Sequence, residues 1–260
     1  MSTFLFDKTI FGPIISRRLG ISLGVNLLPT DSKLCSFDCI YCECGWNPKR
    51  RPGLVLLPKR MEVGSLLRQK LLEMKENGQL PDVITFAGNG EPTMHPDFES
   101  IIEETVQLRN ELSPKSRIAV LSNATMLHKD CVVKALKLVD DNILKLDSAI
   151  LETIQVINKP TGKFGIATLV GNLKKFEGNL IVQTMFLKGS IDGTPFDNTT
   201  ELEVERWIGL LKEIQPKSVM IYSLDRDTPA ENLLAIGLDR LQEIGRRVEK
   251  ETNISVQVSG

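Results

Sequence analysis

Short apolar runs alternate along the chain with longer segments in which apolar residues recur every three or four positions. Runs of four to eight apolar residues bounded by turn residues predict strands, and the longer periodic segments predict amphipathic helices. The predicted strands are 20–28, 82–87, 117–121, 142–146, 179–187 and 218–224, with a short terminal strand over 253–260. The predicted helices are 61–77, 97–110, 129–139, 165–176, 201–214 and 238–251.

This order of elements predicts an α/β fold built from parallel strands. Strands joined by helical crossovers run parallel, with right-handed connections. Six such units are fewer than the eight of a closed barrel, so we expect a partial (β/α)6 TIM-like barrel with its chemistry at the carboxyl ends of the strands. No linker composition divides the chain, which predicts a single domain over 1–260 with an N-terminal extension (1–18) and a long loop (29–58).

Charge and hydropathy limit the classes of partner. Lys and Arg total 32 against 33 Asp and Glu, so no overall field attracts the chain to nucleic acid or to an anionic membrane. A nucleic-acid partner would have to be recognised locally, without support from net charge. No segment approaches the roughly 18 apolar residues of a membrane helix, and residues 1–13 lack the pattern of a signal peptide. We expect a cytoplasmic protein without a membrane partner.

Four of the five cysteines fall between Cys35 and Cys44, and Cys131 stands alone in an apolar helical run. The group is too small and too clustered for a secreted disulfide framework. In a reducing compartment such a group more often binds metal or takes part in redox chemistry. We expect Cys131 to be a core residue.

Cys35, Cys39 and Cys42 are separated by gaps of three and two residues, directly after the first predicted strand. A short loop with this spacing can wrap three thiolates around one iron–sulfur cubane, leaving the fourth iron open to a small molecule. The alternative is a structural zinc site that takes Cys44 as its fourth ligand.

The segment Cys-Ser-Phe-Asp-Cys-Ile-Tyr-Cys resembles the C-x3-C-x-aromatic-C signature of the radical S-adenosylmethionine (SAM) superfamily. The resemblance implies that Cys35, Cys39 and Cys42 bind a [4Fe-4S] cluster whose fourth iron is chelated by SAM. It also implies that Tyr41 lies against the adenine. We call residues 29–58 the cluster loop.

The second predicted strand ends in a glycine-rich turn that supports this resemblance. Gly88, Asn89, Gly90 and Glu91 precede a proline, and the segment is similar to the Gly-Gly-Glu-Pro motif of the same superfamily, which receives the methionine ammonium. Two glycines permit close backbone approach. A plain turn is the alternative interpretation of the motif taken alone.

Polar residues at the next strand ends give further cofactor-binding candidates. Ser122 and Asn123 follow the third strand, where the superfamily contacts the ribose or the carboxylate of SAM; an Asx turn is the alternative. Alternation along the fourth strand places Lys145 and Asp147 on one face, either as an ion pair beside the cofactor or as a solvated pair on an edge. Gln183 is the polar candidate on the fifth strand.

The sixth strand places Tyr222 and Leu224 on one face, with Arg226 just beyond its end. We take Leu224 as a cofactor-binding candidate and Tyr222 as a substrate-binding candidate. Arg226 is either a ligand for a substrate anion or an exposed loop arginine. Arg17 and Arg18, in the segment before the first strand, complete the substrate-binding candidates.

The segment 12–20 and the terminal Ile-Ser-Val-Gln-Val-Ser-Gly resemble the short iron–sulfur oxidoreductases related to the wyosine-synthesis enzymes. The resemblance implies reductive cleavage of SAM to a 5'-deoxyadenosyl radical that abstracts hydrogen from a small molecule, a nucleoside or an RNA base. Two alternatives stay open. One is an activase that installs a glycyl radical on a partner protein, and the other is a zinc-stabilised binding module.

Between Lys49 and Arg60 the chain carries five basic residues and no acidic one. This segment would suit an acidic electron donor such as a flavodoxin or ferredoxin, or a nucleotide phosphate, and a solvated loop is the alternative. The polar, turn-rich stretch after Lys188 is the expected site of substrate specificity.

Overall fold

The computed structural model describes residues 4–16, 19–49 and 55–259. Arg17, Arg18, Arg50 and Arg51 therefore lie outside the described residues. Within the described part of the chain, no helix combines the length and the apolar character needed to cross a membrane.

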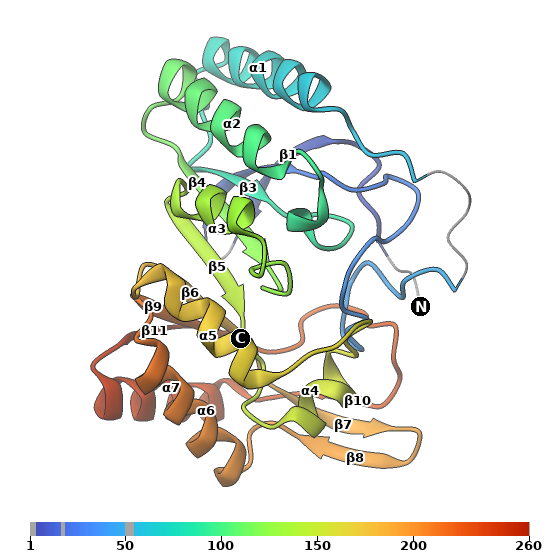
Figure 1. The fold of residues 1–260 in the computed structure, drawn as a ribbon, viewed down its shortest axis with the longest axis vertical. Coiled ribbons are helices and arrows are strands. Elements are labelled where there is room, and N and C mark those ends of the chain that lie inside the picture. Colours follow the sequence, from blue (N-terminus) through green and yellow to red (C-terminus); the bar gives the residue numbers. More distant parts are fainter. Residues whose placement is uncertain (1–3, 17–18, 50–54, 260) are drawn as a thin grey trace.

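An eight-stranded sheet, in the order β1-β2-β3-β4-β5-β6-β9-β11, forms the centre of the molecule (Figure 1). Every neighbouring pair from β2 to β11 is parallel, and only β1 is antiparallel. The sheet curls into a half-barrel, which confirms the predicted partial barrel. Its strands are β1 Ile10–Ser16, β2 Gly20–Val25, β3 Val83–Phe86, β4 Arg117–Ser122, β5 Asp141–Lys145, β6 Ile181–Met185, β9 Ser218–Tyr222 and β11 Ser255–Ser259.

The longer helices pack side by side around the outside of the half-barrel, in chain order. Their apolar faces meet the outward side chains of the strands in one continuous core, which includes Phe86, Phe98 and Trp207. The α-helices are α1 Arg60–Glu76, α2 Phe98–Leu112, α3 Asp130–Lys137, α4 Leu151–Ile157, α5 Ile166–Leu173, α6 Glu201–Ile214 and α7 Leu238–Thr252. The short helices η1 Pro92–Met94 and η2 Lys174–Phe176 follow β3 and α5.

The inward side chains change character along the strands. Ile143, Ile181 and Met220 belong to an apolar cluster inside the barrel. Two residues further along β5 and β6, on the same face, come Lys145 and Gln183. The interior is therefore sealed by apolar packing at the amino ends of the strands and is polar at their carboxyl ends.

Three parts of the fold were not predicted from the sequence. β1 lies within the predicted N-terminal extension and pairs with β2 at the sheet edge, where its largely exposed residues carry no apolar alternation. α4 has only seven residues, too few for a clear helical period. The expected specificity loop after Lys188 is a hairpin, β7 Leu187–Ile191 with β8 Thr194–Asp197, joined by β10 Leu233–Ala235 (Figure 1).

Asn142 on β5 offers a test of the core. It lies two positions before Leu144 and shares its face of the strand, so it faces the helices. Its side chain is buried, and neither amide atom has a hydrogen-bond partner among the described residues. An unpaired buried amide destabilises the fold, so Asn142→Leu, of similar size, should raise the free energy of unfolding by roughly 1 kcal/mol in urea denaturation. A lower stability would show that bound water satisfies the amide.

Candidate functional site

A pocket of about 210 Å³ opens at the carboxyl ends of the central strands. The cluster loop forms one wall, and the ends of β3, β4, β5 and β6 form the others. Eleven of the residues singled out from the sequence line this pocket: Cys35, Cys39, Tyr41, Cys42, Gly88, Gly90, Glu91, Ser122, Asn123, Lys145 and Gln183. Residues far apart in the sequence are thus brought together around one space.

Two backbone hydrogen bonds join the start of the cluster loop to the turn after β3. Leu34 N–H donates to the Asn89 carbonyl at 2.9 Å, and Glu91 N–H donates to the Leu34 carbonyl at 3.0 Å. Gly90 lies between them with φ of +136°, where an added Cβ would overlap the Leu34 carbonyl oxygen. A glycine at position 90 allows the backbone contact that fixes Leu34, and with it the neighbouring Cys35.

Glu91 ties the end of β3 to the end of β4. Its buried carboxylate accepts hydrogen bonds from the Ser122 hydroxyl at 2.8 Å, the Asn123 backbone N–H at 2.6 Å, the Thr93 backbone N–H at 3.1 Å and the Thr93 hydroxyl. Burial raises the pKa of Glu91, and these hydrogen bonds oppose that rise. The four donors hold the carboxylate in a fixed orientation in the pocket wall.

Two of the three pocket cysteines have a nitrogen donor. The Asn123 amide lies 3.5 Å from the Cys35 sulfur, and the Asn158 amide lies 3.4 Å from the Cys39 sulfur. The positive charge of Lys33 favours the thiolate of the third, Cys42. N–H donors stabilise the thiolate form, so the site is prepared for negatively charged sulfur.

The cysteines differ in acidity. Burial raises the pKa of Cys39 to about 11, and burial together with the charge of Glu91 raises the pKa of Cys35. For Cys42 the neighbouring Cys44 side chain has the largest effect, and together with Lys33 it brings the pKa down to about 6. Cys42 is therefore the most acidic of the three.

In the protein without bound metal, we expect Cys42 to be alkylated faster than Cys39 at neutral pH. The thiolate is the reactive form, and a pKa of about 6 leaves most Cys42 ionised while Cys39 stays protonated. The iodoacetamide rate, followed by peptide mass spectrometry, should rise through a midpoint near pH 6. Cys44→Ala removes the main acidifying contact, so its midpoint should lie higher; an unchanged midpoint would refute the assignment.

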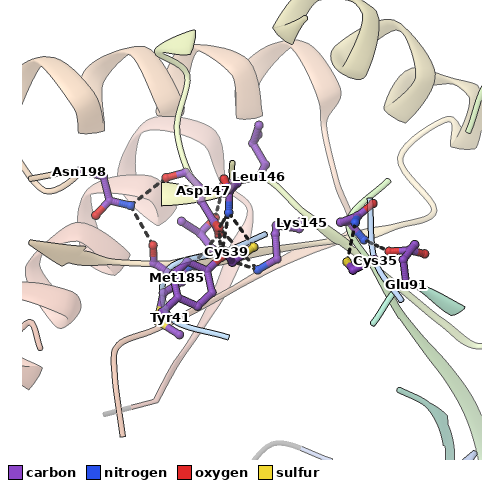
Figure 2. A network of polar contacts seen from close by, with 12 residues as sticks. Cys35, Cys39, Tyr41, Glu91, Lys145, Leu146, Asp147, Met185 and Asn198 are labelled. Atoms are coloured by element: carbon purple, nitrogen blue, oxygen red, sulfur yellow. Dashed lines mark hydrogen bonds and ion pairs between the residues drawn. The ribbon is translucent and has the colours of Figure 1, made fainter. Parts of the chain in front are cut away.

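A second buried network holds Tyr41 (Figure 2). Its hydroxyl donates to Asp147 and accepts from the Lys145 ammonium at 2.9 Å. The Asn158 amide donates to the Tyr41 oxygen at 3.0 Å and to Asp147 at 2.7 Å. The ammonium of Lys145 and the carboxylate of Asp147 form an ion pair at 3.5 Å, and the Asp147 side chain is fully buried.

This network fixes how Tyr41 and Lys145 face the pocket. Burial and the nearby Asp147 raise the pKa of Tyr41, so the hydroxyl stays protonated. Burial alone would lower the pKa of Lys145, but Asp147, Tyr222 and Cys39 together outweigh burial and the net pKa is raised, so the lysine stays charged. The ring of Tyr41 and the ammonium of Lys145 line the pocket, while Asp147 lies behind them.

The other sequence candidates lie outside the pocket wall. Asn89 is fully buried, and its amide binds the Phe6 carbonyl at 2.9 Å and the Pro29 carbonyl at 2.7 Å, so its side chain holds the N-terminal segment. Tyr222 and Leu224 pack against the cluster of apolar residues around Cys39. Arg226 forms an exposed ion pair with Glu43 at 2.6 Å.

The sequence analysis did not identify Lys33 and Asn158 as site residues. Asn158 contacts the Cys39 thiol and Lys33 lowers the pKa of Cys42, yet neither lies in a recognised motif. Asn158 follows α4, the helix without a clear period. Lys33 stands two positions before Cys35, and only its near-complete burial distinguishes it from a surface lysine.

Three thiols around one pocket form the donor set that an iron–sulfur cluster would use, whereas a structural zinc ion would need a fourth ligand in a closed site. Among the described residues, no group of three or more His, Cys, Asp or Glu side chains is arranged to hold a single metal ion. In a cubane each cysteine binds a different iron, so the thiols surround a shared space. Cys44 donates to the Gly88 carbonyl at 3.4 Å, outside the pocket wall, and Cys131 is exposed on α3 rather than in the core.

Curated relatives cover most of the chain, although no family profile matches it. A UPF0026 protein of Synechocystis is 31% identical over 231 residues, which are 86% of this chain and 78% of that protein. A UPF0026 protein of Helicobacter pylori is 30% identical over 84% of this chain and 66% of its own length. A Brachyspira hyodysenteriae protein named GTPase Obg is 28% identical over 98% of this chain, which spans only 35% of that protein. The present chain has no G-x4-G-K-[ST] phosphate-binding loop.

Solved structures with the same fold are radical SAM proteins. A radical SAM methyltransferase from Sphaerobacter thermophilus superposes with a TM-score of 0.66 at 14% identity, covering 92% of this chain and 65% of that one. Streptococcus suis SuiB bound to S-adenosylmethionine gives 0.63 at 15% identity, covering 91% and 50%. TYW1 with a lysine–pyruvate adduct gives 0.60 at 13%, covering 89% and 74%. The chain therefore belongs to the UPF0026 family and has the fold of the radical SAM enzymes.

Proposed function

We propose that this protein is a radical SAM enzyme in which Cys35, Cys39 and Cys42 hold a [4Fe-4S] cluster. The observation that supports it most is that three thiols from one loop share a pocket with the polar ends of four parallel strands. Thiolates are the preferred ligands of such clusters, and three of them leave one iron for an exogenous ligand. The cluster would supply one electron that breaks a carbon–sulfur bond of SAM, giving methionine and a 5'-deoxyadenosyl radical that takes a hydrogen atom from the substrate.

The pocket residues suit the polar parts of SAM. The fixed carboxylate of Glu91 faces the pocket and can accept a hydrogen bond from the methionine ammonium. Ser122 and Asn123 bring hydroxyl and amide groups to the same wall. The Tyr41 ring offers an aromatic face to the adenine, because its hydroxyl is anchored to Asp147 behind the wall. The protein's contribution is to orient SAM and exclude other hydrogen donors.

For the substrate we propose a small molecule or a base of a nucleoside or RNA. The net charge of −1 gives no general attraction to RNA, which favours a small substrate. Because TYW1 has been solved with a lysine–pyruvate adduct, we considered whether Lys145 forms a Schiff base with a carbonyl substrate. Attack on a carbonyl needs a neutral amine, and Asp147 keeps Lys145 protonated, so we propose that Lys145 binds a negatively charged group instead.

We further propose that a flavodoxin or ferredoxin delivers the electron in a reducing cytoplasm. The segment from Lys49 to Arg60, which includes residues outside the described part, supplies five positive charges at and just after the end of the cluster loop for an acidic donor. Lys49 itself is exposed.

The test is anaerobic reconstitution with iron and sulfide, followed by incubation with SAM and dithionite. We expect a brown protein and the release of 5'-deoxyadenosine, measured by chromatography and mass spectrometry. A protein that binds one zinc per chain through four sulfurs, and that releases no 5'-deoxyadenosine, would refute the proposal.

A further inference from the structure

Lys33 is a buried cation to which neither the motifs nor the relatives give a role. The residue is 4% exposed, and its side chain contacts the backbone of the cluster loop to which it belongs. Its ammonium donates to the Gly45 carbonyl at 2.8 Å and to the Asp38 carboxylate at 3.2 Å. A lysine is seldom so deeply buried unless its charge is compensated.

A small frame of hydrogen bonds holds Lys33 in place. The Asp38 carboxylate also accepts from the Asn47 backbone N–H at 2.8 Å. The Asn47 side chain in turn accepts from the Cys35 backbone N–H at 3.0 Å and donates to the Phe37 carbonyl at 3.0 Å. The ammonium is therefore fixed relative to the backbone that carries the cysteines.

The charge of Lys33 acts on all three pocket cysteines. Gly45, whose carbonyl binds its ammonium, donates its backbone N–H to the Cys42 carbonyl at 2.9 Å, and Cys35 follows Lys33 by two positions. Asp38 is partly exposed, with 26% of its side chain open to solvent, so water screens that carboxylate. The Asp38 carboxylate therefore offsets the charge of Lys33 only in part.

A positive charge at this place has a redox consequence. A [4Fe-4S] cluster with three thiolates is negatively charged, and reduction adds one further electron. A fixed cation in a poorly solvated site favours the more negative state, and such charges and hydrogen bonds at sulfur set cluster potentials.

We propose that Lys33 is a positioning residue that raises the reduction potential of the cluster held by Cys35, Cys39 and Cys42. This inference rests on the proposed function, since it needs that cluster. Lys33 does not line the pocket, so it would act through the sulfur ligands. It makes the cluster easier for a donor of moderate potential to reduce.

The experiment compares full-length, anaerobically reconstituted variants by redox titration monitored by electron paramagnetic resonance. Lys33→Met should shift the midpoint potential to a more negative value than that of the unsubstituted protein. Lys163→Met is the matched control, because Lys163 is exposed in a loop that contacts the cluster loop through Thr161, and its midpoint should not move. An unchanged midpoint in Lys33→Met would overturn the inference.

A second variant tests the opposite sign. Asp38→Asn keeps the size of the side chain but removes the negative charge that partly offsets Lys33, so its midpoint should shift to a more positive value. If Lys33→Met fails to assemble a cluster, the midpoint potential of Asp38→Asn becomes the test of the proposal. A midpoint that is unchanged or more negative in Asp38→Asn would refute the role of Lys33. If the unsubstituted protein assembles no cluster, it is the proposed function that fails.

Discussion

Replacing any one of Cys35, Cys39 and Cys42 by alanine is expected to abolish 5'-deoxyadenosine release from SAM. Each of the three thiols faces the same pocket, and each would bind a different iron, so none can substitute for another. The measurement is product formation per chain under dithionite, together with the iron content of the reconstituted variant. We expect product at background level in all three variants.

The control is the fourth thiol of the same loop. Cys44 lies outside the pocket wall, where it donates to the Gly88 carbonyl, so Cys44→Ala should keep much of the activity. A partial loss of activity would come from the missing Cys44 side chain, which lowers the pKa of Cys42. Equal loss in Cys44→Ala and Cys42→Ala would contradict a three-ligand site and support a four-thiolate one.

The alternation of side chains along the strands predicted which polar residues face the barrel interior. The period of two placed Lys145 and Asp147 on one face at the end of the strand, and the structure contains their ion pair, with Asp147 two residues past the last residue of β5. The same rule put Gln183 inside the barrel, where it lines the pocket. These inferences succeed because parallel strands end at one edge, so that a local pattern also fixes a position in space.

Residues that act through tertiary contacts could not be found in this way. Asn158 reaches Cys39 across 119 positions of sequence, and Asn89 is turned towards Phe6 across 83 positions. The sequence does not distinguish a buried lysine such as Lys33 from an exposed one, because burial depends on tertiary packing. The β7–β8 hairpin is different, because Asp192 and Gly193 form a two-residue turn with positive φ that the sequence does signal.

The glycine that joins the cluster loop to the sheet leads to the second large expected effect. Gly90→Ala should lower the free energy of unfolding by roughly 3 kcal/mol or more, because alanine is strained at this φ and its Cβ meets a backbone oxygen that cannot rotate away. The backbone hydrogen bonds between Leu34 and the turn after β3 would be lost with that approach. Since Cys35 follows Leu34 directly, the reconstituted variant should also bind less iron.

Gly171→Ala is the matched control for this substitution. Gly171 lies in α5 with no neighbouring atom near an added Cβ, so alanine there should stabilise the protein by about 0.5–1 kcal/mol through its higher helix propensity. Urea denaturation of the two variants should therefore give changes of opposite sign, and iron content should fall only in Gly90→Ala. If both variants unfold at the same urea concentration, the backbone contact at Gly90 does not position the cluster loop. In that case the pocket would have to be held mainly by the Glu91 and Asp147 networks, whose hydrogen bonds reach the same cysteines from the strands.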